Sequence, residues 1–477
     1  MSAPDKAAAV ATVAVVGGGW AGCAAAVELA RRGVKVTLFE AARSLGGRAR
    51  AVDVHGRTLD NGQHILLGAY KQTLGLMKRV GVDPSAALLR LPLQMRYPAG
   101  SGGMDFLAPR LPAPWHLIVA LMRATGLTRE DKLALGRFST AAKWMGWRLD
   151  LDVSVATLLA RFEQTPRLVR LMWHPLCLAA LNTPPEQASA NVFLAVLRDS
   201  LGAKRAASDM LIPRRDLGAL FPQAAGRYLA AKGGAVQLGA KVDSLSLEQH
   251  GWELGASGQA LGGAWRGRFD AVVLATPPAQ ASALLAPFPE AAALTAGLDA
   301  FAYEPIATCY LQYETSVRLP LPFCALLDDP AAGRFGQFAF DRGQLDALQS
   351  GLLAVVVSAA GPAAALDQDS LARAIAAQLD AAFPGLGLEA PLWSRVITEK
   401  RATFACTPGL ARPQNATPLP GLVLAGDYTA SDYPATLESA VRSAQAAATV
   451  ILRGGASSAK NRSPSHAAGA AASESLP

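Results

Sequence analysis

Three glycines near the start of the chain have the spacing of a dinucleotide-binding turn. Gly17, Gly19 and Gly22 form a Gly-x-Gly-x-x-Gly pattern directly after the short β-branched run 12–16, and a helix-forming stretch follows. Gly17 permits a tight turn, Gly19 lets the backbone approach a pyrophosphate, and Gly22 lets helix and strand pack closely. Unpaired N–H groups at the start of the helix, including that of Ala21, favour a phosphate there.

An acidic residue and a second glycine pair indicate which dinucleotide would bind. Glu40 ends the second expected strand, 34–40, and a carboxylate there accepts both ribose hydroxyls while repelling a 2′-phosphate. Gly46, Gly47 and Arg48 then allow the chain to return along the pyrophosphate with an added cation, a second strip that an NAD site does not need. The pattern therefore favours FAD. The alternative for the first motif is a glycine-rich turn that binds no ligand, and the alternative for Arg48 is an arginine exposed to solvent.

The elements that position these residues come from separated parts of the chain. Short apolar or alternating runs, typical of strands, occur at 12–16, 34–40, 236–247, 271–275, 308–313, 352–358 and 422–425. Helical periodicity predicts helices at 21–32, 69–80, 116–123, 129–144, 155–160, 191–199, 216–232 and 435–453. The sequence thus predicts an α/β fold with a Rossmann-like, discontinuous parallel sheet and a second domain laid over it.

This pattern also predicts the domain limits. We expect the dinucleotide-binding domain to comprise 12–65, 213–280 and 415–453, and the substrate-binding domain to comprise 66–212 and 281–414. The small, polar stretches 1–11 and 454–477 lack periodicity and are predicted to be disordered.

Longer motifs carry a family resemblance. The fingerprint, the Glu-Ala-x(4)-Gly-Gly-Arg strip at 40–48 and Gly426-Asp427 before a helix resemble the amine oxidase and phytoene desaturase superfamily of FAD enzymes. The stretches 59–70 and 425–440 resemble, more narrowly, the bacterial hydroxysqualene dehydroxylases of squalene and hopanoid biosynthesis. The similarity spans about residues 12–453. It implies a mixed α+β substrate domain of the amine oxidase type and a C30 isoprenoid substrate.

The resemblance also assigns residues to FAD. It implies that the ADP half is held by Gly17, Gly19, Ala21, Gly22, Glu40, Gly47 and Arg48, with the backbone of Val242 at the adenine. It implies that Gly426 and Asp427 face the pyrophosphate and the ribityl chain, and that Gly62 and Gln63 lie where the chain passes the isoalloxazine. Thr436 and Leu437 would direct N–H groups at a helix start toward the pyrimidine edge of the flavin. One departure is Ser439, which stands where the superfamily pattern places a glycine.

The resemblance further implies a reductive reaction in which an allylic hydroxyl leaves as water and reduced flavin donates hydride. His64 would lie beside the flavin and could protonate the leaving hydroxyl, or only orient the pocket. Asp60 is expected to cap a turn, and Asp432 to act as an acid or as an N-cap. The rival functions are a carotenoid-type desaturase, an amine or protoporphyrinogen oxidase, and a lipid carrier without flavin.

Composition excludes several classes of partner. The 477 residues are 51% hydrophobic and carry a formal net charge of +8 without a run of five basic residues, so nucleic acid is not an expected partner. The six histidines lack metal-ligand spacing, so no metal is expected. Five scattered cysteines suit a reducing compartment. With neither a secretory signal nor a transmembrane segment in the sequence, a cytoplasmic location is predicted.

One helical region suggests contact with a membrane. The run 116–122 is almost wholly apolar and lies near Trp115, Trp144, Trp147 and Arg148. Tryptophan beside arginine is typical of a bilayer interface, so this face could dip into the inner side of the cytoplasmic membrane as a peripheral contact. A buried core helix explains the same run equally well.

Overall fold

A five-stranded parallel sheet joins the first, middle and last parts of the chain. In spatial order its strands are β10 (Ala235–Leu238), β2 (Lys35–Glu40), β1 (Thr12–Val16), β14 (Ala271–Leu274) and β20 (Leu422–Leu424). Val16 lies beside both Phe39 and Leu274, and Leu274 lies beside Leu424. The carboxyl ends of four strands therefore meet at one edge of the sheet. The structure is a computed structural model that describes residues 10–460.

Both faces of this sheet are covered. Val13 and Val15 pack with α1 (Trp20–Arg31), α12 (Pro222–Ala231) and α16 (Leu437–Lys460). Ala14 and Val16 belong instead to the core on the opposite face, where an antiparallel sheet lies. That sheet consists of β11 (Lys241–Glu248), β12 (Gly251–Ser257) and β13 (Trp265–Phe269). Burial on two sides explains why these strands read as continuous apolar runs.

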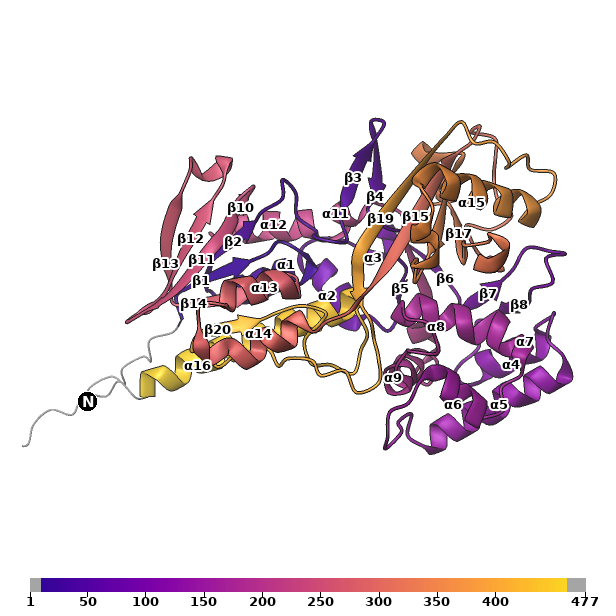
Figure 1. Ribbon diagram of the computed structural model, residues 1–477, viewed down its shortest axis with the longest axis horizontal. Helices are drawn as coiled ribbons and strands as arrows, with labels where there is room; N and C mark the ends of the chain where they lie inside the picture. The colour runs from indigo at the N-terminus through magenta and orange to yellow at the C-terminus, as the bar shows by residue number, and fades with distance from the viewer. Residues whose placement is uncertain (1–9, 461–477) are drawn as a thin grey trace, which may run out of the picture.

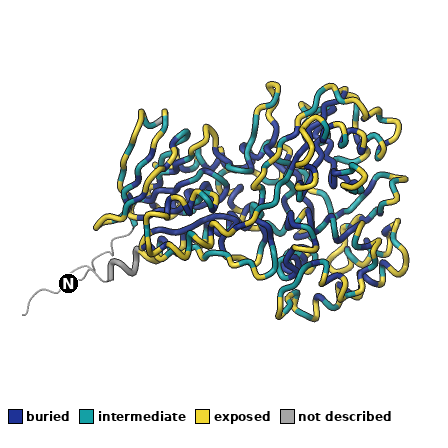
Figure 2. The backbone as a smooth tube through the Cα atoms, viewed as in Figure 1, coloured by how far each residue is buried: buried dark blue, intermediate teal, exposed yellow. Residues whose placement is uncertain are grey.

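A second sheet forms the core of the remaining part of the molecule. Its antiparallel order is β16 (Phe323–Ala325), β17 (Phe338–Asp341), β18 (Leu352–Val357), β15 (Tyr303–Gln312) and β19 (Trp393–Phe404). One face packs on α15 (Gln368–Ala382). Figure 1 shows the parallel sheet toward one end of the long axis and this sheet toward the other, with the long strands β15 and β19 running between them. Many of the buried residues lie in the two sheets (Figure 2).

Helices fill the end of the molecule beside the second sheet (Figure 1). They are α4 (Trp115–Arg123), α5 (Arg129–Trp144), α6 (Val155–Arg161), α7 (Pro166–Leu168), α8 (His174–Leu181) and α9 (Ala190–Ser200). The remaining helices are α2 (Lys71–Arg79), α3 (Pro84–Ala87), α10 (Arg205–Ser208), α11 (Leu217–Leu220), α13 (Pro278–Leu285) and α14 (Ala292–Asp299). The small strands are β3 (Ala51–Val54), β4 (Arg57–Asp60), β5 (Leu66–Leu67), β6 (Leu88–Leu91), β7 (Gln94–Arg96), β8 (Asp105–Leu107) and β9 (Met210–Pro213).

The α/β fold class with a discontinuous parallel sheet and a mixed α+β second part is confirmed. Two predicted elements are wrong. The single helix expected at 216–232 is broken at Phe221, because the following Pro222 disfavours helical backbone before it. The single strand expected at 236–247 divides into β10 and β11 at Gly239, whose φ of +64° turns the chain. The domain limits stay a prediction.

Parts of the two segments predicted to be disordered are ordered in the structure. Residues 454–460 continue α16, and the Ala11 amide donates to the Asp270 carboxylate at 2.8 Å. The rest of both predicted segments, 1–9 and 461–477, lies outside the described residues. Across 10–460, no helix combines the length and the apolar character needed to cross a bilayer.

Two glycine substitutions test the packing of α1 against the first turn. A Cβ on Gly22 would lie 1.8 Å from the Gly17 carbonyl oxygen, so we expect Gly22→Ala to lower the free energy of unfolding by about 3 kcal/mol. Gly75, inside α2, has open space around its Cα, so Gly75→Ala should raise it by about 0.5–1 kcal/mol. Thermal unfolding midpoints measure both. Equal shifts in the two variants would contradict close packing at Gly22.

Candidate cofactor site

The glycine turn lies at the carboxyl end of β1. Gly17 has a φ of +104°, and a Cβ on it would lie 2.6 Å from the Ala275 carbonyl oxygen, so only glycine fits. Gly19 is the N-cap of α1, and Ala21 lies in the first turn of that helix. The first N–H groups of a helix have no acceptor within it, so they are available to an anion in front of the turn.

The Glu40 carboxylate is fixed against this turn. It accepts hydrogen bonds from the amides of Gly18, at 2.6 Å, and Ala42, at 2.7 Å. A Cβ on Gly18 would lie 2.9 Å from that of Glu40, a close approach that was not predicted from the sequence. The carboxylate is thus held at the end of β2, next to the end of β1, as the spacing predicts.

The second glycine strip runs beside the first. The Gly46 amide donates to the Gly18 carbonyl at 2.8 Å, and a Cβ on Gly47 would lie 3.0 Å from Gly19 Cα. Buried Val242 comes two residues after Ala240, whose amide donates to the Glu40 carbonyl at 2.9 Å. The structure therefore brings the predicted residues of the ADP half into one neighbourhood.

Arg48 and Asp427 form an ion pair that was not predicted from the sequence. Arg48 Nη2 lies 2.7 Å from each Asp427 carboxylate oxygen, and Arg48 Nη1 donates to the Ala402 carbonyl at 2.7 Å. Both residues had been predicted to face the pyrophosphate, but separately. The pair joins positions 379 residues apart and connects the second glycine strip to the loop after β20.

Arg412 holds the loop that follows Asp427. Its guanidinium donates to the carbonyls of Tyr433, at 2.6 Å, and Ser431, at 2.9 Å, and also contacts the carbonyls of Asp427 and Tyr428. It lies 4.8 Å from the centroid of the Phe404 ring. The sequence gives no signal for this role, because the partners are backbone oxygens of a loop.

The start of α16 is closed by a reciprocal cap. Thr436 Oγ1 accepts from the Ser439 amide at 3.1 Å, and Ser439 Oγ accepts from the Thr436 amide at 3.0 Å. This pairing explains the serine that departs from the superfamily pattern. Since the Thr436 amide is used in the cap, the Leu437 amide is the better candidate for a ligand. Asp432 is exposed and precedes the cap, so its expected N-cap role is wrong.

Glu438 fixes this helix to α2. Its buried carboxylate accepts from the Thr73 amide at 2.9 Å, the Thr73 hydroxyl at 2.8 Å and the Gln72 amide at 3.2 Å. It also pairs with Arg442 Nε at 2.8 Å. Tyr433 connects the same region to α9 through a hydrogen bond from its hydroxyl to the Asp199 carboxylate.

The segment after β4 is fixed by buried polar contacts. The Asp60 carboxylate accepts at 2.7 Å from the Leu217 amide, which is the first amide of α11, whose N-cap is Asp216. The expectation that Asp60 caps the turn after it is therefore wrong. Burial raises the pKa of Asp60 to about 6. The Tyr310 hydroxyl donates to the Asp60 carbonyl at 2.9 Å, and Gln63 Oε1 accepts from Arg342 at 3.0 Å.

His64 lies in this segment with one ring nitrogen engaged. Its Nδ1 lies 2.7 Å from the Gly62 carbonyl oxygen, which can only accept, so Nδ1 carries the proton and Nε2 is the nitrogen left for other partners. Burial lowers the pKa of His64, and the Arg48 guanidinium lowers it further. The imidazole is therefore mainly neutral at pH 7.

Two buried hydroxyls at the same sheet edge fit a polar ligand. Thr276 Oγ1 and Tyr428 Oη have no hydrogen-bond partner among the described residues. They follow β14 and β20, where open parallel sheets bind their ligands. Unpaired buried hydroxyls are costly, so these two favour a cofactor with polar groups. The Thr-Pro-Pro sequence after 271–275 was the available signal for Thr276.

Comparisons with known proteins identify the family of the chain. The family model for flavin-containing amine oxidoreductases matches residues 20–452. A hydroxysqualene dehydroxylase of Rhodopseudomonas palustris is 32% identical over 93% of this chain and 99% of its own. A zeta-carotene desaturase of Synechocystis is 25% identical over 92% and 97%. The crystal structure of a putative protoporphyrinogen oxidase from Exiguobacterium superposes with a TM-score of 0.66 at 19% identity, covering 93% and 99%.

Arg412 offers a test of the site that leaves its predicted ligand contacts in place. Lysine cannot reach several carbonyl oxygens at once, so we expect Arg412→Lys to weaken flavin binding about tenfold or more. Arg395→Lys, at an exposed position on β19, is the matched control and should bind flavin normally. Fluorescence quenching during reconstitution of flavin-free protein measures both. Unchanged affinity in Arg412→Lys would show that the loop does not depend on this guanidinium.

Proposed function

Since the chain belongs to the family of flavin-containing amine oxidoreductases, we propose that it uses FAD to remove the hydroxyl group of hydroxysqualene, giving squalene. Membership makes the chain a flavin-dependent oxidoreductase. The choice of FAD is supported by how far the candidate binding groups extend along one edge of the sheet. These groups are Glu40, the two glycine strips, the Arg48–Asp427 pair and the start of α16. The choice of substrate is supported by the near full-length similarity to a hydroxysqualene dehydroxylase.

Each part of this edge has a proposed partner on FAD. Amides of the first turn and α1 would bind the pyrophosphate, Glu40 would bind the ribose hydroxyls, and the backbone at Val242 would meet the adenine. Asp427 would face the ribityl chain, and the Leu437 amide at the start of α16 would approach the pyrimidine edge. The positive end of the α16 dipole would stabilise negative charge on that edge.

The chemistry requires a proton and a hydride. When bound and reduced, FAD supplies the hydride. We assign the proton to the imidazolium form of His64, whose Nε2–H would give its proton to the substrate oxygen so that the C–O bond breaks and water leaves. The allylic carbon keeps its double bond and gains one hydrogen, so the organic product is squalene. Apolar side chains around the substrate would keep water from recapturing the carbon centre.

The second candidate is desaturation of a polyisoprenoid. It is favoured by the similarity to a zeta-carotene desaturase, which covers nearly the whole chain at lower identity. The direction of electron flow separates the two reactions. Dehydroxylation consumes reduced flavin, whereas desaturation consumes oxidised flavin.

Product analysis tests the proposed direction. We expect anaerobic, flavin-reduced protein to convert hydroxysqualene to squalene, with one oxidised flavin formed for each squalene. Mass spectrometry and flavin absorbance measure the two yields. Squalene added instead of hydroxysqualene should leave the flavin reduced. If the oxidised protein instead reduces its flavin with zeta-carotene or phytoene and leaves hydroxysqualene untouched, the desaturase assignment replaces this one.

The pH dependence of the reaction tests His64. Because burial and Arg48 lower its pKa below the ordinary value, the protonated fraction should grow as the pH falls from 8 to 6. We therefore expect kcat/KM for hydroxysqualene to rise over that range. His64→Asn keeps a donor for the Gly62 carbonyl but cannot titrate, so it should bind flavin, lose about a hundredfold in rate and lose the slope. A flat wild-type profile, or an active Asn variant, would assign His64 to orientation alone.

A further inference from the structure

One region of the surface holds most of the large apolar side chains that are exposed. Among the described residues, twelve such side chains are exposed, and eight of them lie between 107 and 151. These eight are Leu107, Leu111, Trp115, Ile118, Met122, Leu133, Trp144 and Leu151. We call the outward faces of α4 and α5, with the loops before and after them, the α4–α5 surface. The concentration in one tenth of the chain indicates a binding surface.

The exposed apolar residues of α4 form one stripe. Trp115, Ile118 and Met122 are spaced three and four positions apart, which places them on one side of the helix, and exposed Leu111 lies in the loop before it. The exposed fractions of Trp115 and Met122 are 60% and 63%. The opposite side of α4 is buried through His116 and Ala120. The run is therefore neither a wholly buried core helix nor a wholly exposed one.

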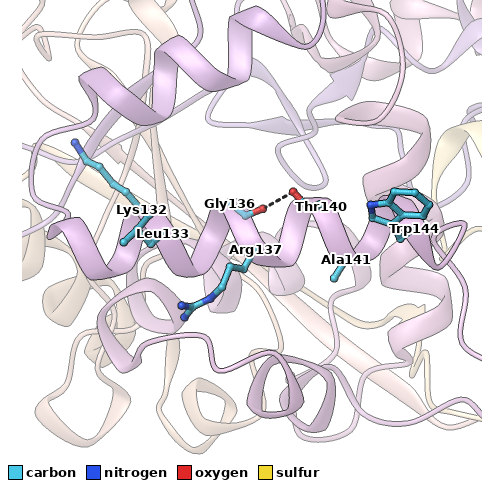
Figure 3. A pocket seen from close by; sticks show the side chains of 7 residues that line it. All are labelled: Lys132, Leu133, Gly136, Arg137, Thr140, Ala141 and Trp144. Carbon is cyan, nitrogen blue, oxygen red and sulfur yellow. Dashed lines mark hydrogen bonds between the residues drawn. The ribbon is translucent and has the colours of Figure 1, made fainter.

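The outward side of α5 continues this surface. Leu133 and Trp144, eleven residues apart, lie along a shallow groove whose lining includes Lys132, Arg137 and Thr140, and Trp144 is 87% exposed. Figure 3 shows the lysine, the arginine and the tryptophan projecting from the helix. Phe138 and Ala142 are buried on the inner side. Lys132 Nζ donates to the Met122 carbonyl at 2.9 Å, so the end of α4 lies beside the start of α5.

The charge of this surface is strongly basic. Residues 107–151 contain seven Lys or Arg and three Asp or Glu, so they carry half of the formal net charge of +8. Of the acids, Asp131 is buried in the capping box of α5, which leaves Glu130 and Asp150 exposed. Glu163 lies 4.0 Å from Arg137 and neutralises it in part. The exposed apolar stripes are thus bordered by an excess of cations.

We propose that the α4–α5 surface docks on a lipid bilayer that contains anionic headgroups. Tryptophan, methionine and leucine side chains would enter the boundary between headgroups and acyl chains, while arginine and lysine would bind the phosphates. A protein partner would need acidic groups matched to each cation, whereas anionic lipids adapt to any arrangement of cations. The surface lies at the end of the molecule away from the parallel sheet, so docking leaves the cofactor edge free (Figure 1).

Vesicle flotation tests the proposal with purified, flavin-loaded protein. We expect the protein to float with vesicles of phosphatidylcholine and phosphatidylglycerol, and about tenfold less with phosphatidylcholine alone or in high salt. A triple variant, Trp115→Ser, Met122→Ser and Trp144→Ser, should lose about tenfold or more of the binding. The control carries Leu348→Ser and Leu392→Ser, at side chains that are 88% and 63% exposed elsewhere, and should float like the wild type.

The proposal is overturned if the wild type does not bind vesicles, or if it binds neutral vesicles as well as anionic ones. It is also overturned if the control variant loses as much vesicle binding as the triple variant. A light-scattering measurement without lipid that shows a dimer in the wild type and a monomer in the triple variant would assign the surface to a second copy of the chain. Flavin absorbance of each variant reports folding. Because flotation needs no turnover, its result is independent of the proposed reaction.

Discussion

The cofactor site depends on one geometric constraint, the alignment of parallel strands whose carboxyl ends share an edge. Val16, Leu274 and Leu424 lie side by side, although the last is more than four hundred positions from the first. The loops that follow these strands therefore lie close together at one edge of the sheet. The contact of Arg48 Nη2 with both Asp427 oxygens then joins two loops that are distant in sequence. Parallel pairing thus converts distance in sequence into proximity in space.

The start of α16 shows how much of the chain is used to fix one helix end. Ser439 closes its first turn, Glu438 binds it to α2, and Arg412 holds the loop before it. These three contacts use different chemistry: a hydroxyl, a carboxylate and a guanidinium. A helix dipole acts on a neighbouring group only if its direction is fixed, since its effect falls off within one turn. The contacts therefore matter for electrostatics as much as for stability.

The sequence was sufficient where the signal is local. The fold class was predicted from the glycine spacing, from Glu40 and from the alternation of strand-like and helix-like segments. The resemblance to flavoenzymes of the hydroxysqualene dehydroxylase type is confirmed. The Arg48–Asp427 pair and the Arg412 contacts could not be predicted, because they join side chains to partners fixed only by the tertiary fold. The break at Phe221 was predictable from Pro222, since proline restricts the residue before it.

The order of the strands also has a consequence for synthesis of the protein. The parallel sheet takes its first strand from the start of the chain and its last, β20, from residues 422–424, just before α16. The chain must therefore be synthesised as far as β20 before this edge of the sheet is complete. Before the later strands are made, β1 and β2 can pair with each other but lack β10 on one side and β14 and β20 on the other, so the complete sheet edge forms only late in synthesis.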